Sequence, residues 1–342
     1  MDEGEQARPL TADPAADSAY ADAHRQLQDL RALLDRVIVG QGELVTLLIT
    51  AVFAGGHVLI EGLPGLGKTH LAKALAAALG LHWARVQCTP DLMPADVTGA
   101  EIYATAAGGA STFEFRPGPV FAQLVLVDEI NRATPRTQSA LLEAMQERQV
   151  THAGISHRLP HPFCVLATQN PIELEGTYPL PEAQLDRFMF KLTVPFPDRG
   201  SLRALLDVSL DAEPADTLQP IAGPADVLRI AELCRTVLLG ERCKEAAVDL
   251  IVATQPDSSG SDAGARRHIR YGASPRALQA LIRAARVGAV IAGRSHVDID
   301  DLAAVALPVL RHRILLRLES ELDGLDADAT LASVIDGWRR QF

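Results

Sequence analysis

Three short apolar runs, each about the length of one strand, lie in the first two hundred residues. They occupy positions 58–60, 124–127 and 163–168, and weaker strand patterns lie at 83–88 and 191–195. Strands of a parallel sheet are covered on both faces, so they read as continuous apolar runs and not as alternating ones. Helical spacing separates the runs, as at Leu71, Leu75 and Leu79. The alternation of strand and helix patterns predicts an α/β domain with a parallel sheet.

The pattern changes at both ends of this α/β region. From residue 199 onward only helical spacing is found, for example at Val227, Ile230 and Leu233. Residues 1–18 contain few large apolar side chains and many Ala, Asp, Glu and Pro, which is the composition of a disordered segment. The sequence therefore predicts a disordered acidic tail at 1–18, an α/β domain at 19–197 and an all-helical domain at 198–342.

A first β-hairpin pattern turns at Gly108 and Gly109 and interrupts a helix of the α/β domain. Phe113 and Phe115 lie two residues apart, which puts both on one face of this hairpin. Two interpretations remain open. The two rings pack on their own domain, or they form a contact surface for another protein.

A second hairpin pattern turns at Ala153 and Gly154 and carries His152 and His157. No cluster of carboxylates or cysteines accompanies these histidines, so we interpret them as exposed hairpin residues and not as a metal site.

Composition narrows the class of protein. Of the 342 residues 48% are hydrophobic, which is ample for packed cores, yet no apolar run reaches membrane-spanning length. The formal charge of −11 argues against non-specific binding of nucleic acid or anionic lipid. Four cysteines without metal-ligand spacing are interpreted as reduced core thiols. The acidic N-terminus has no signal-peptide layout, so we expect a cytoplasmic location.

The strongest chemical signal is the segment 62–69, which reads G-x-x-x-x-G-K-[ST] between a strand pattern and a helix pattern. Backbone N–H groups of such a loop and the helix dipole behind it bind phosphates. Lys68 is expected to reach the β- and γ-phosphates of ATP, and Thr69 to ligate Mg²⁺. The predicted nucleotide contacts in this segment are Gly62, Leu63, Pro64, Gly65, Leu66, Gly67, Lys68, Thr69 and His70.

Polar side chains follow two of the other strand patterns. Asp128 and Glu129 end the second apolar run, and Asn170 follows the third. The carboxyl ends of parallel strands face the ligand crevice of an open sheet. We therefore predict that Asp128 holds Mg²⁺, that Glu129 polarises the attacking water, and that Asn170 hydrogen-bonds the γ-phosphate.

The apolar loop around Val39 and Gly40 follows a helical pattern that ends near residue 35. In a nucleotide-binding domain such a loop walls the adenine. It reads equally well as a loop that joins two helices, and both interpretations are kept.

Taken together, these landmarks resemble the AAA+ ATPase superfamily and, within it, the MoxR family. The resemblance runs from about residue 35 to 316 and rests on the strings at 113–119, 128–133, 138–145, 167–171 and 176–188. It implies an αβα sandwich followed by a helical lid. It also implies that Asn170 is the sensor 1 residue, Arg187 the arginine finger and Arg276 sensor 2. The two hairpins match the family's helix 2 insertion and pre-sensor 1 insertion.

The resemblance further implies a ring of subunits, which we expect to be a hexamer. In this ring Arg187 would act on the nucleotide of a neighbouring subunit. Members of the family are chaperone-like ATPases. They are thought to act on proteins with von Willebrand factor A-type domains, often in metal or cofactor insertion or complex maturation.

Three other functions remain open. A DNA-associated motor of the same superfamily would need a basic pore or a winged helix, against which the charge of −11 counts. A magnesium-chelatase-type subunit shares both insertions and would be active only with a porphyrin-binding partner. A nucleotide-switched scaffold would turn ATP over slowly, which a steady-state assay would reveal.

Overall fold

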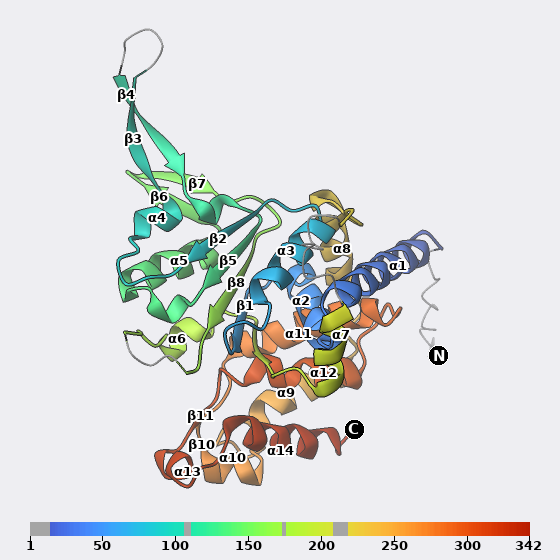
Figure 1. Ribbon diagram of the computed structural model, residues 1–342. Helices are drawn as coiled ribbons and strands as arrows, with labels where there is room; N and C mark the ends of the chain where they lie inside the picture. The colour runs from blue at the N-terminus through green and yellow to red at the C-terminus, as the bar shows by residue number, and fades with distance from the viewer. Residues whose placement is uncertain (1–13, 106–110, 173–175, 208–217) are drawn as a thin grey trace, which may run out of the picture.

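The computed structural model describes residues 14–105, 111–172, 176–207 and 218–342. Its centre is a parallel five-stranded sheet (Figure 1). The strand order from edge to edge is β2 (Trp83–Gln87), β5 (Leu124–Asp128), β8 (Cys164–Gln169), β1 (Val58–Gly62) and β9 (Phe190–Val194). All five predicted strands are confirmed.

Helices cover both faces of the sheet, and the alternation of side chains along each strand divides the core in two. Leu124 and Leu126 join an apolar cluster with α1 (Pro14–Val37), α2 (Gly42–Phe53) and α3 (Lys68–Ala78). Val125 and Val127 point to the other face. There they pack with α4 (Pro94–Thr98) and α5 (Pro135–Glu147). This is the αβα sandwich that the sequence predicts.

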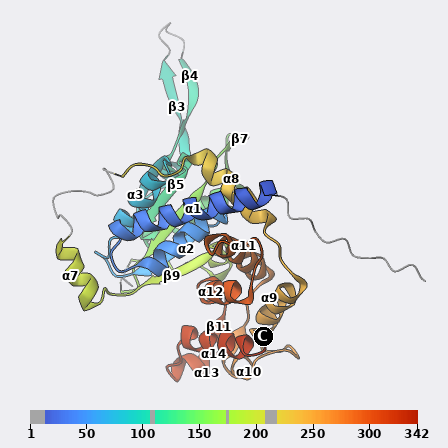
Figure 2. The same cartoon turned by 90° about the vertical axis from the view of Figure 1, so that its right-hand side faces the viewer.

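The first hairpin pairs β3 (Gly99–Thr105) with β4 (Ser111–Pro117) and projects away from the body in both views (Figures 1 and 2). Its turn at 106–110 lies outside the described residues. The structure separates the two phenylalanines. Phe113 is 68% exposed and packs edge to face on Tyr103, whereas Phe115 is half-buried between the hairpins. The contact-surface interpretation therefore remains for Phe113, and Phe115 packs on its own domain.

The second hairpin pairs β6 (Gln149–His152) with β7 (Ile155–Arg158), and its turn residues Ala153 and Gly154 both have positive φ. Phe115 stacks on His157 with ring centroids 4.0 Å apart and lies 5.7 Å from His152. No group of metal-binding side chains is found among the described residues. The histidines thus join the two hairpins through Phe115.

The C-terminal part consists of helices that share the first apolar cluster, through residues such as Val227, Leu281 and Leu302. It also contains a two-stranded sheet of β10 (Ile269–Tyr271) and β11 (Leu315–Leu316), which a helix-only pattern does not predict. The helices are α7 (Arg199–Asp207), α8 (Pro224–Thr236), α9 (Glu241–Ala253), α10 (Ala263–His268), α11 (Pro275–Ile291), α12 (Ile299–Leu310), α13 (Leu318–Leu322) and α14 (Ala327–Arg339).

The expected tail boundary at residue 18 is wrong. Residues 14–18 form the start of α1, whose later turns bury Ala23, Leu27 and Leu30. A helix extends more easily than it starts, so the packed later turns stabilise first turns that contain few large apolar side chains. Residues 1–13 lie outside the described part of the chain. Among the described helices, none is long and apolar enough to cross a membrane.

Candidate functional site

The carboxyl ends of β1, β2, β5 and β8 meet at one edge of the sheet around a cavity of about 460 Å³, which we call the phosphate cavity. Predicted residues from three separate segments line it: the loop after β1, the carboxylates after β5 and the amide after β8. Its lining residues are Pro64, Gly65, Gly67, Lys68, Thr69, His70, Lys73, Arg85, Gln87, Asp128, Glu129, Thr168 and Asn170.

The loop between β1 and α3 needs its glycines for different reasons. Gly65 and Gly67 have φ of +80° and +76°, a conformation that side chains with a Cβ rarely adopt. Nothing lies within 4 Å of a Cβ at either position, so the space beside them is open. Gly62, in contrast, sits against β9, because a Cβ there would lie 3.0 Å from Cβ of Val194. The open backbone next to the helix start is suited to a phosphate.

Lys68 is the first residue of α3, and its ammonium Nζ donates to the carbonyl oxygen of Gly62 at 2.5 Å. Burial lowers the pKa of Lys68, and the nearby carboxylates of Asp128, Glu129 and Glu61 partly offset that effect. A partly desolvated ammonium group at the start of a helix is suited to bind a phosphate.

Asp128 is nearly buried, at 7% exposure, and its two carboxylate oxygens have different partners. Oδ1 accepts from the Thr168 hydroxyl at 3.2 Å, and Oδ2 accepts from Nε of Arg85 at 2.7 Å. The carboxylate already binds a positive group, and Thr69, which carries a hydroxyl oxygen, lines the same cavity. Such hard oxygen donors fit Mg²⁺.

Glu129 has the left-handed φ of 56°, which is rare for a residue other than glycine. A hydrogen bond stabilises this backbone conformation, because the amide of Glu129 donates to the hydroxyl of Thr168 at 2.9 Å. Its carboxylate Oε2 lies 3.3 Å from Nε2 of Gln87 and 3.5 Å from Arg132. Strained backbone of this kind is common at functional sites, where it aims a side chain.

Asn170 is 5% exposed and lines the phosphate cavity directly after β8. Its side-chain Oδ1 accepts from the amide of Ile172 at 3.2 Å. That contact fixes the amide group, so its NH₂ remains as the donor toward a ligand.

A second, apolar cavity of about 250 Å³ lies beside the loop and is suited to a nucleobase; we call it the base cavity. Val39, Leu66 and His70 line it, together with Phe196 and Leu202 from the segment after β9. Leu63 lines neither cavity.

Gly40 lines a different cavity, between α2, β9 and α12. A Cβ at Gly40 would lie 2.1 Å from Oγ of Ser201, and its φ is +74°. Gly40 is thus required for the turn and for the approach of α7.

Arg187 and Arg276 lie elsewhere, in a cavity of about 260 Å³ between the sheet and the helical part, which we call the arginine cavity. Five arginines line it: Arg148, Arg187, Arg276, Arg283 and Arg313. Arg276, which the resemblance makes sensor 2, stands at the start of α11. The carboxylate of Asp186 is near it, with Nη1 of Arg276 3.9 Å from Oδ2.

A buried histidine forms part of the wall of the arginine cavity. His57 Nδ1 accepts from the amide of Val165 at 3.0 Å, and Nε2 lies 3.2 Å from the carbonyl oxygen of Met145, to which it donates. Burial, followed by the charge of Arg148, lowers the pKa of His57 to about 4. The imidazole is therefore neutral at physiological pH.

Sequence reasoning missed four residues of the phosphate cavity: Lys73, Arg85, Gln87 and Thr168. A signal for Arg85 and Gln87 was present, because both are polar and lie two residues apart at the carboxyl end of a strand. Gln87 is in register with Asp128 on the neighbouring strand. Thr168 belongs to an apolar run, and only the placement of β8 beside β5, which brings its hydroxyl to Asp128, reveals its role.

Comparisons with known proteins agree with this geometry. Residues 57–190 match the model of the ATPase family associated with various cellular activities (AAA), and residues 262–334 match the AAA lid domain. The chain is 40% identical over 301 residues to a protein of Mycobacterium tuberculosis named chaperone MoxR1, covering 88% of this chain and 78% of that protein. It is 36% identical over 321 residues to protein MoxR of Paracoccus denitrificans, covering 88% and 91%.

A solved structure gives the same result for the fold. A protein of Cytophaga hutchinsonii whose name proposes an ATPase superposes with a TM-score of 0.86 at 37% identity. The match covers 94% of this chain and 97% of that one. It includes both the sheet and the helical part.

Proposed function

The chain belongs to the MoxR-type AAA+ ATPases, and on this premise we propose that it binds ATP with Mg²⁺ in the phosphate cavity and hydrolyses it. One observation carries the proposal: the phosphate loop, both carboxylates and Asn170 line a single cavity. The base cavity beside it has the size and apolar walls to receive the adenine. We also propose that the lid begins near residue 198.

The residues of the phosphate cavity divide the work. Lys68 and the loop amides bind the phosphates in the ground state, while Thr69 and Asp128 hold Mg²⁺. Mg²⁺ bound there would neutralise part of the charge on the phosphate oxygens. Glu129 orients the attacking water and accepts its proton, and Asn170 donates to the γ-phosphate.

We further propose that the site is completed by a neighbouring subunit. Arg187 and Arg276 line the arginine cavity and not the phosphate cavity of their own chain. An arginine finger stabilises the charge on the transferred phosphoryl group and is worth about 10³- to 10⁵-fold in rate. A head-to-tail ring, which we propose to be a hexamer, would bring the arginine cavity of one subunit to the phosphate cavity of the next.

A protein client is the final part of this proposal. The relative in Mycobacterium tuberculosis is named a chaperone. The family resemblance favours a client with a von Willebrand factor A-type domain and a role in metal or cofactor insertion or complex maturation. Tyr103 and Phe113 form an exposed aromatic pair on the projecting hairpin, which is a surface of the kind that binds proteins.

The test uses two inactive variants. Glu129→Gln should bind ATP without hydrolysing it, and Arg187→Ala should bind ATP and hydrolyse it at least about 10³-fold more slowly. Random mixing gives about one interface in four with an intact Glu129 on one side and an intact Arg187 on the other. ATPase activity should therefore return on mixing, up to roughly a quarter of the wild-type rate if the sites act independently.

Subunit exchange is followed in parallel by energy transfer between labelled subunits. If exchange occurs and no activity returns, either Arg187 acts within its own subunit or the ring hydrolyses ATP only in concert. Normal turnover by Arg187→Ala alone would refute the trans role. Near-wild-type turnover by Glu129→Gln alone would remove the assignment of the base.

A further inference from the structure

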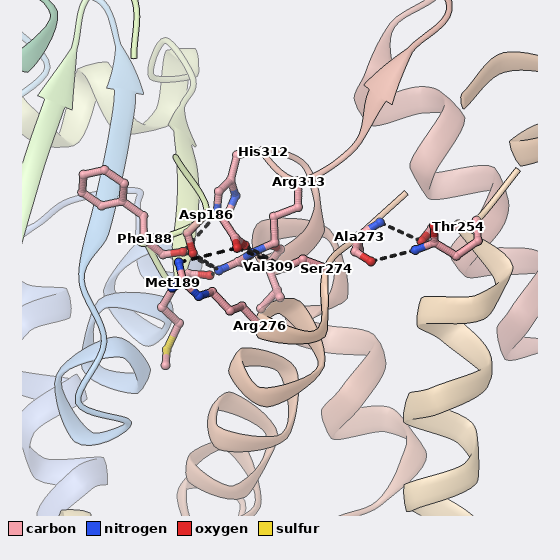
Figure 3. A network of polar contacts seen from close by, with 11 residues as sticks. Asp186, Phe188, Met189, Thr254, Ala273, Ser274, Arg276, Val309, His312 and Arg313 are labelled. Carbon is pink, nitrogen blue, oxygen red and sulfur yellow. Dashed lines mark hydrogen bonds and ion pairs between the residues drawn. The ribbon is translucent and has the colours of Figure 1, made fainter. Parts of the chain in front are cut away.

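The segment that carries Arg187 is held from two sides. Residues 186–189 connect the short helix α6 (Glu182–Leu185) to β9 and have no regular structure. Their amides donate toward the α/β domain: Arg187 to Gln184, Phe188 to Leu185, and Met189 to His57. The carbonyl oxygens of residues 186, 188 and 189 all accept from the lid (Figure 3).

One lid residue makes most of these contacts. Arg313, between α12 and β11, donates through its Nη atoms to the carbonyl oxygens of Phe188 at 2.6 Å, Asp186 at 3.1 Å and Met189 at 3.1 Å. Its Nε donates to the Asp186 carboxylate at 2.7 Å. Only 3% of the Arg313 side chain is exposed. The planar guanidinium thus fixes the backbone on both sides of Arg187.

Two further lid residues join this contact. His312 donates from Nε2 to the carbonyl oxygen of Phe188 at 3.0 Å. Ser274 stands at the N-cap of α11 but makes no cap hydrogen bond, and its hydroxyl instead lies 3.1 Å from each carboxylate oxygen of Asp186. The hydroxyl of an N-cap serine usually accepts from an amide of the first helical turn, whereas the Ser274 hydroxyl donates to the carboxylate of Asp186. The same carboxylate lies near Arg276.

The Arg187 side chain projects from the backbone segment that Arg313 contacts. Its Nε is buried without a hydrogen-bond partner in the described structure, and its side chain lines the arginine cavity. The position of this side chain therefore depends on the backbone of residues 186–189. That backbone is set by the lid as much as by the sheet.

We propose that Arg313, Asp186 and Ser274 are positioning residues that transmit the orientation of the lid to Arg187. Arg187 then reaches the phosphate of the neighbouring subunit only when the lid is hydrogen-bonded to residues 186–189. The inference rests on the proposed trans role of Arg187. It adds a defined path from the lid of one subunit to the nucleotide of the next.

The chain offers a matched control for a purely structural role. Arg311 lies two residues before Arg313 and also joins the lid to β9, through Oγ1 of Thr193 at 2.8 Å and the carbonyl oxygen of Lys191 at 3.4 Å. Within the described part of the chain, Arg311 forms no hydrogen bond or ion pair with residues 186–189, and its Nη2 lies 3.0 Å from the carboxylate of Asp328. If Arg313 served only to attach the lid, Arg311→Gln would mimic Arg313→Gln.

The experiment determines whether each variant impairs the phosphate cavity of its own subunit or the arginine that it presents to the neighbouring subunit. Arg313→Gln should lower turnover by about tenfold or more, while ATP affinity stays within about threefold. Mixed with Glu129→Gln, which supplies an intact Arg187, it should regain activity. Mixed with Arg187→Ala it should not, because neither partner then presents a working finger. Arg311→Gln should retain turnover within about threefold.

Three outcomes would overturn the inference. These are equal losses in the Arg311 and Arg313 variants, recovery on mixing with Arg187→Ala, or no recovery with Glu129→Gln from a folded protein. If Arg313→Gln does not fold, Ser274→Ala takes its place, with a loss of about threefold and the same mixing behaviour. Unchanged turnover in folded Ser274→Ala would then refute the coupling. Normal turnover by Arg187→Ala alone, in contrast, would refute the shared site itself.

Discussion

The phosphate cavity lies within the α/β domain, the arginine cavity lies between that domain and the helical part, and the two are built in opposite ways. In the phosphate cavity each group follows its own strand, as Lys68 follows β1 and Asp128 ends β5. In the arginine cavity Asp186 meets Arg313 across 127 positions of sequence. The first is made by local motifs, and the second only by the docking of the lid.

Their charges differ as well. The phosphate cavity combines two carboxylates with cations, and the carboxylate of Asp128 already contacts Arg85. The arginine cavity has five arginines and, among its described lining residues, Asp186 as its carboxylate. Local motifs thus build the half that binds nucleotide, and tertiary packing builds a cationic half that is suited to an anion from outside.

The largest expected effect separates the two cavities directly. Lys68→Ala should weaken ATP binding by about 100-fold or more, because truncating one partner of a desolvated charge pair costs over about 2.7 kcal/mol. Arg276→Ala should leave binding to the separated subunit within about threefold, since Arg276 lies in the other cavity. Titration of a fluorescent ATP analogue at low protein concentration measures both. Equal losses would mean that the two cavities share a ligand within one chain.

An effect of intermediate size concerns the stability of the folded protein at acid pH, which depends on His57 in the wall of the arginine cavity. The pKa of His57 is about 4 in the folded protein against 6.5 when unfolded, so the unfolded state takes up a proton first as the pH falls. The free energy of unfolding that depends on His57 therefore falls as the pH is lowered from 6.5 to about 4. From pH 7 to 5 this residue alone should lower the free energy of unfolding by about 2 kcal/mol.

His312, whose pKa is also held well below 6.5 by burial and by Arg313, adds to the loss in the same direction. His57→Asn keeps an acceptor near the Val165 amide and cannot titrate. Urea unfolding at pH 7 and pH 5 should show a smaller pH dependence for this variant than for the wild type. An identical change in both proteins would contradict the assignment.

The smallest effect belongs to the phosphate cavity. Arg85 is half-exposed and pairs with Asp128, where Mg²⁺ is proposed to bind. Removing such a pair changes free energies by up to about 1 kcal/mol, so Arg85→Ala should raise the affinity for Mn²⁺, a spectroscopic substitute for Mg²⁺, by up to about fivefold. Electron paramagnetic resonance of nucleotide-free protein measures it, with Gln87→Ala as control. Unchanged or weaker binding would show that Arg85 does not compete with the metal.

The sequence predicted the sheet, both hairpins and the phosphate cavity because each rests on short-range patterns. Three continuous apolar runs became central strands, and the polar residues at their carboxyl ends met as expected. The paired positive-φ turn at Ala153 and Gly154 is likewise a local property. Such features are decided by propensity and by the period of side chains along one segment.

What escaped prediction depends on long-range contacts. The anion near Arg276 is Asp186, which no spacing rule connects to it. The start of α1 before residue 18 is stabilised by packing further along the helix. Phe113 and Phe115 share a strand face, yet His157 of the other hairpin covers only the second. Each outcome required knowledge of what lies opposite in space.

The stack of Phe115 on His157 has a mechanical consequence. It ties the β3–β4 hairpin to the β6–β7 hairpin, with Tyr103 and Phe113 nearer the outer end of the first hairpin. The β6–β7 hairpin follows α5 directly, and the C-cap residue of α5, Arg148, lines the arginine cavity. The arginine cavity and the exposed aromatic pair are therefore joined by an unbroken series of covalent and packing contacts.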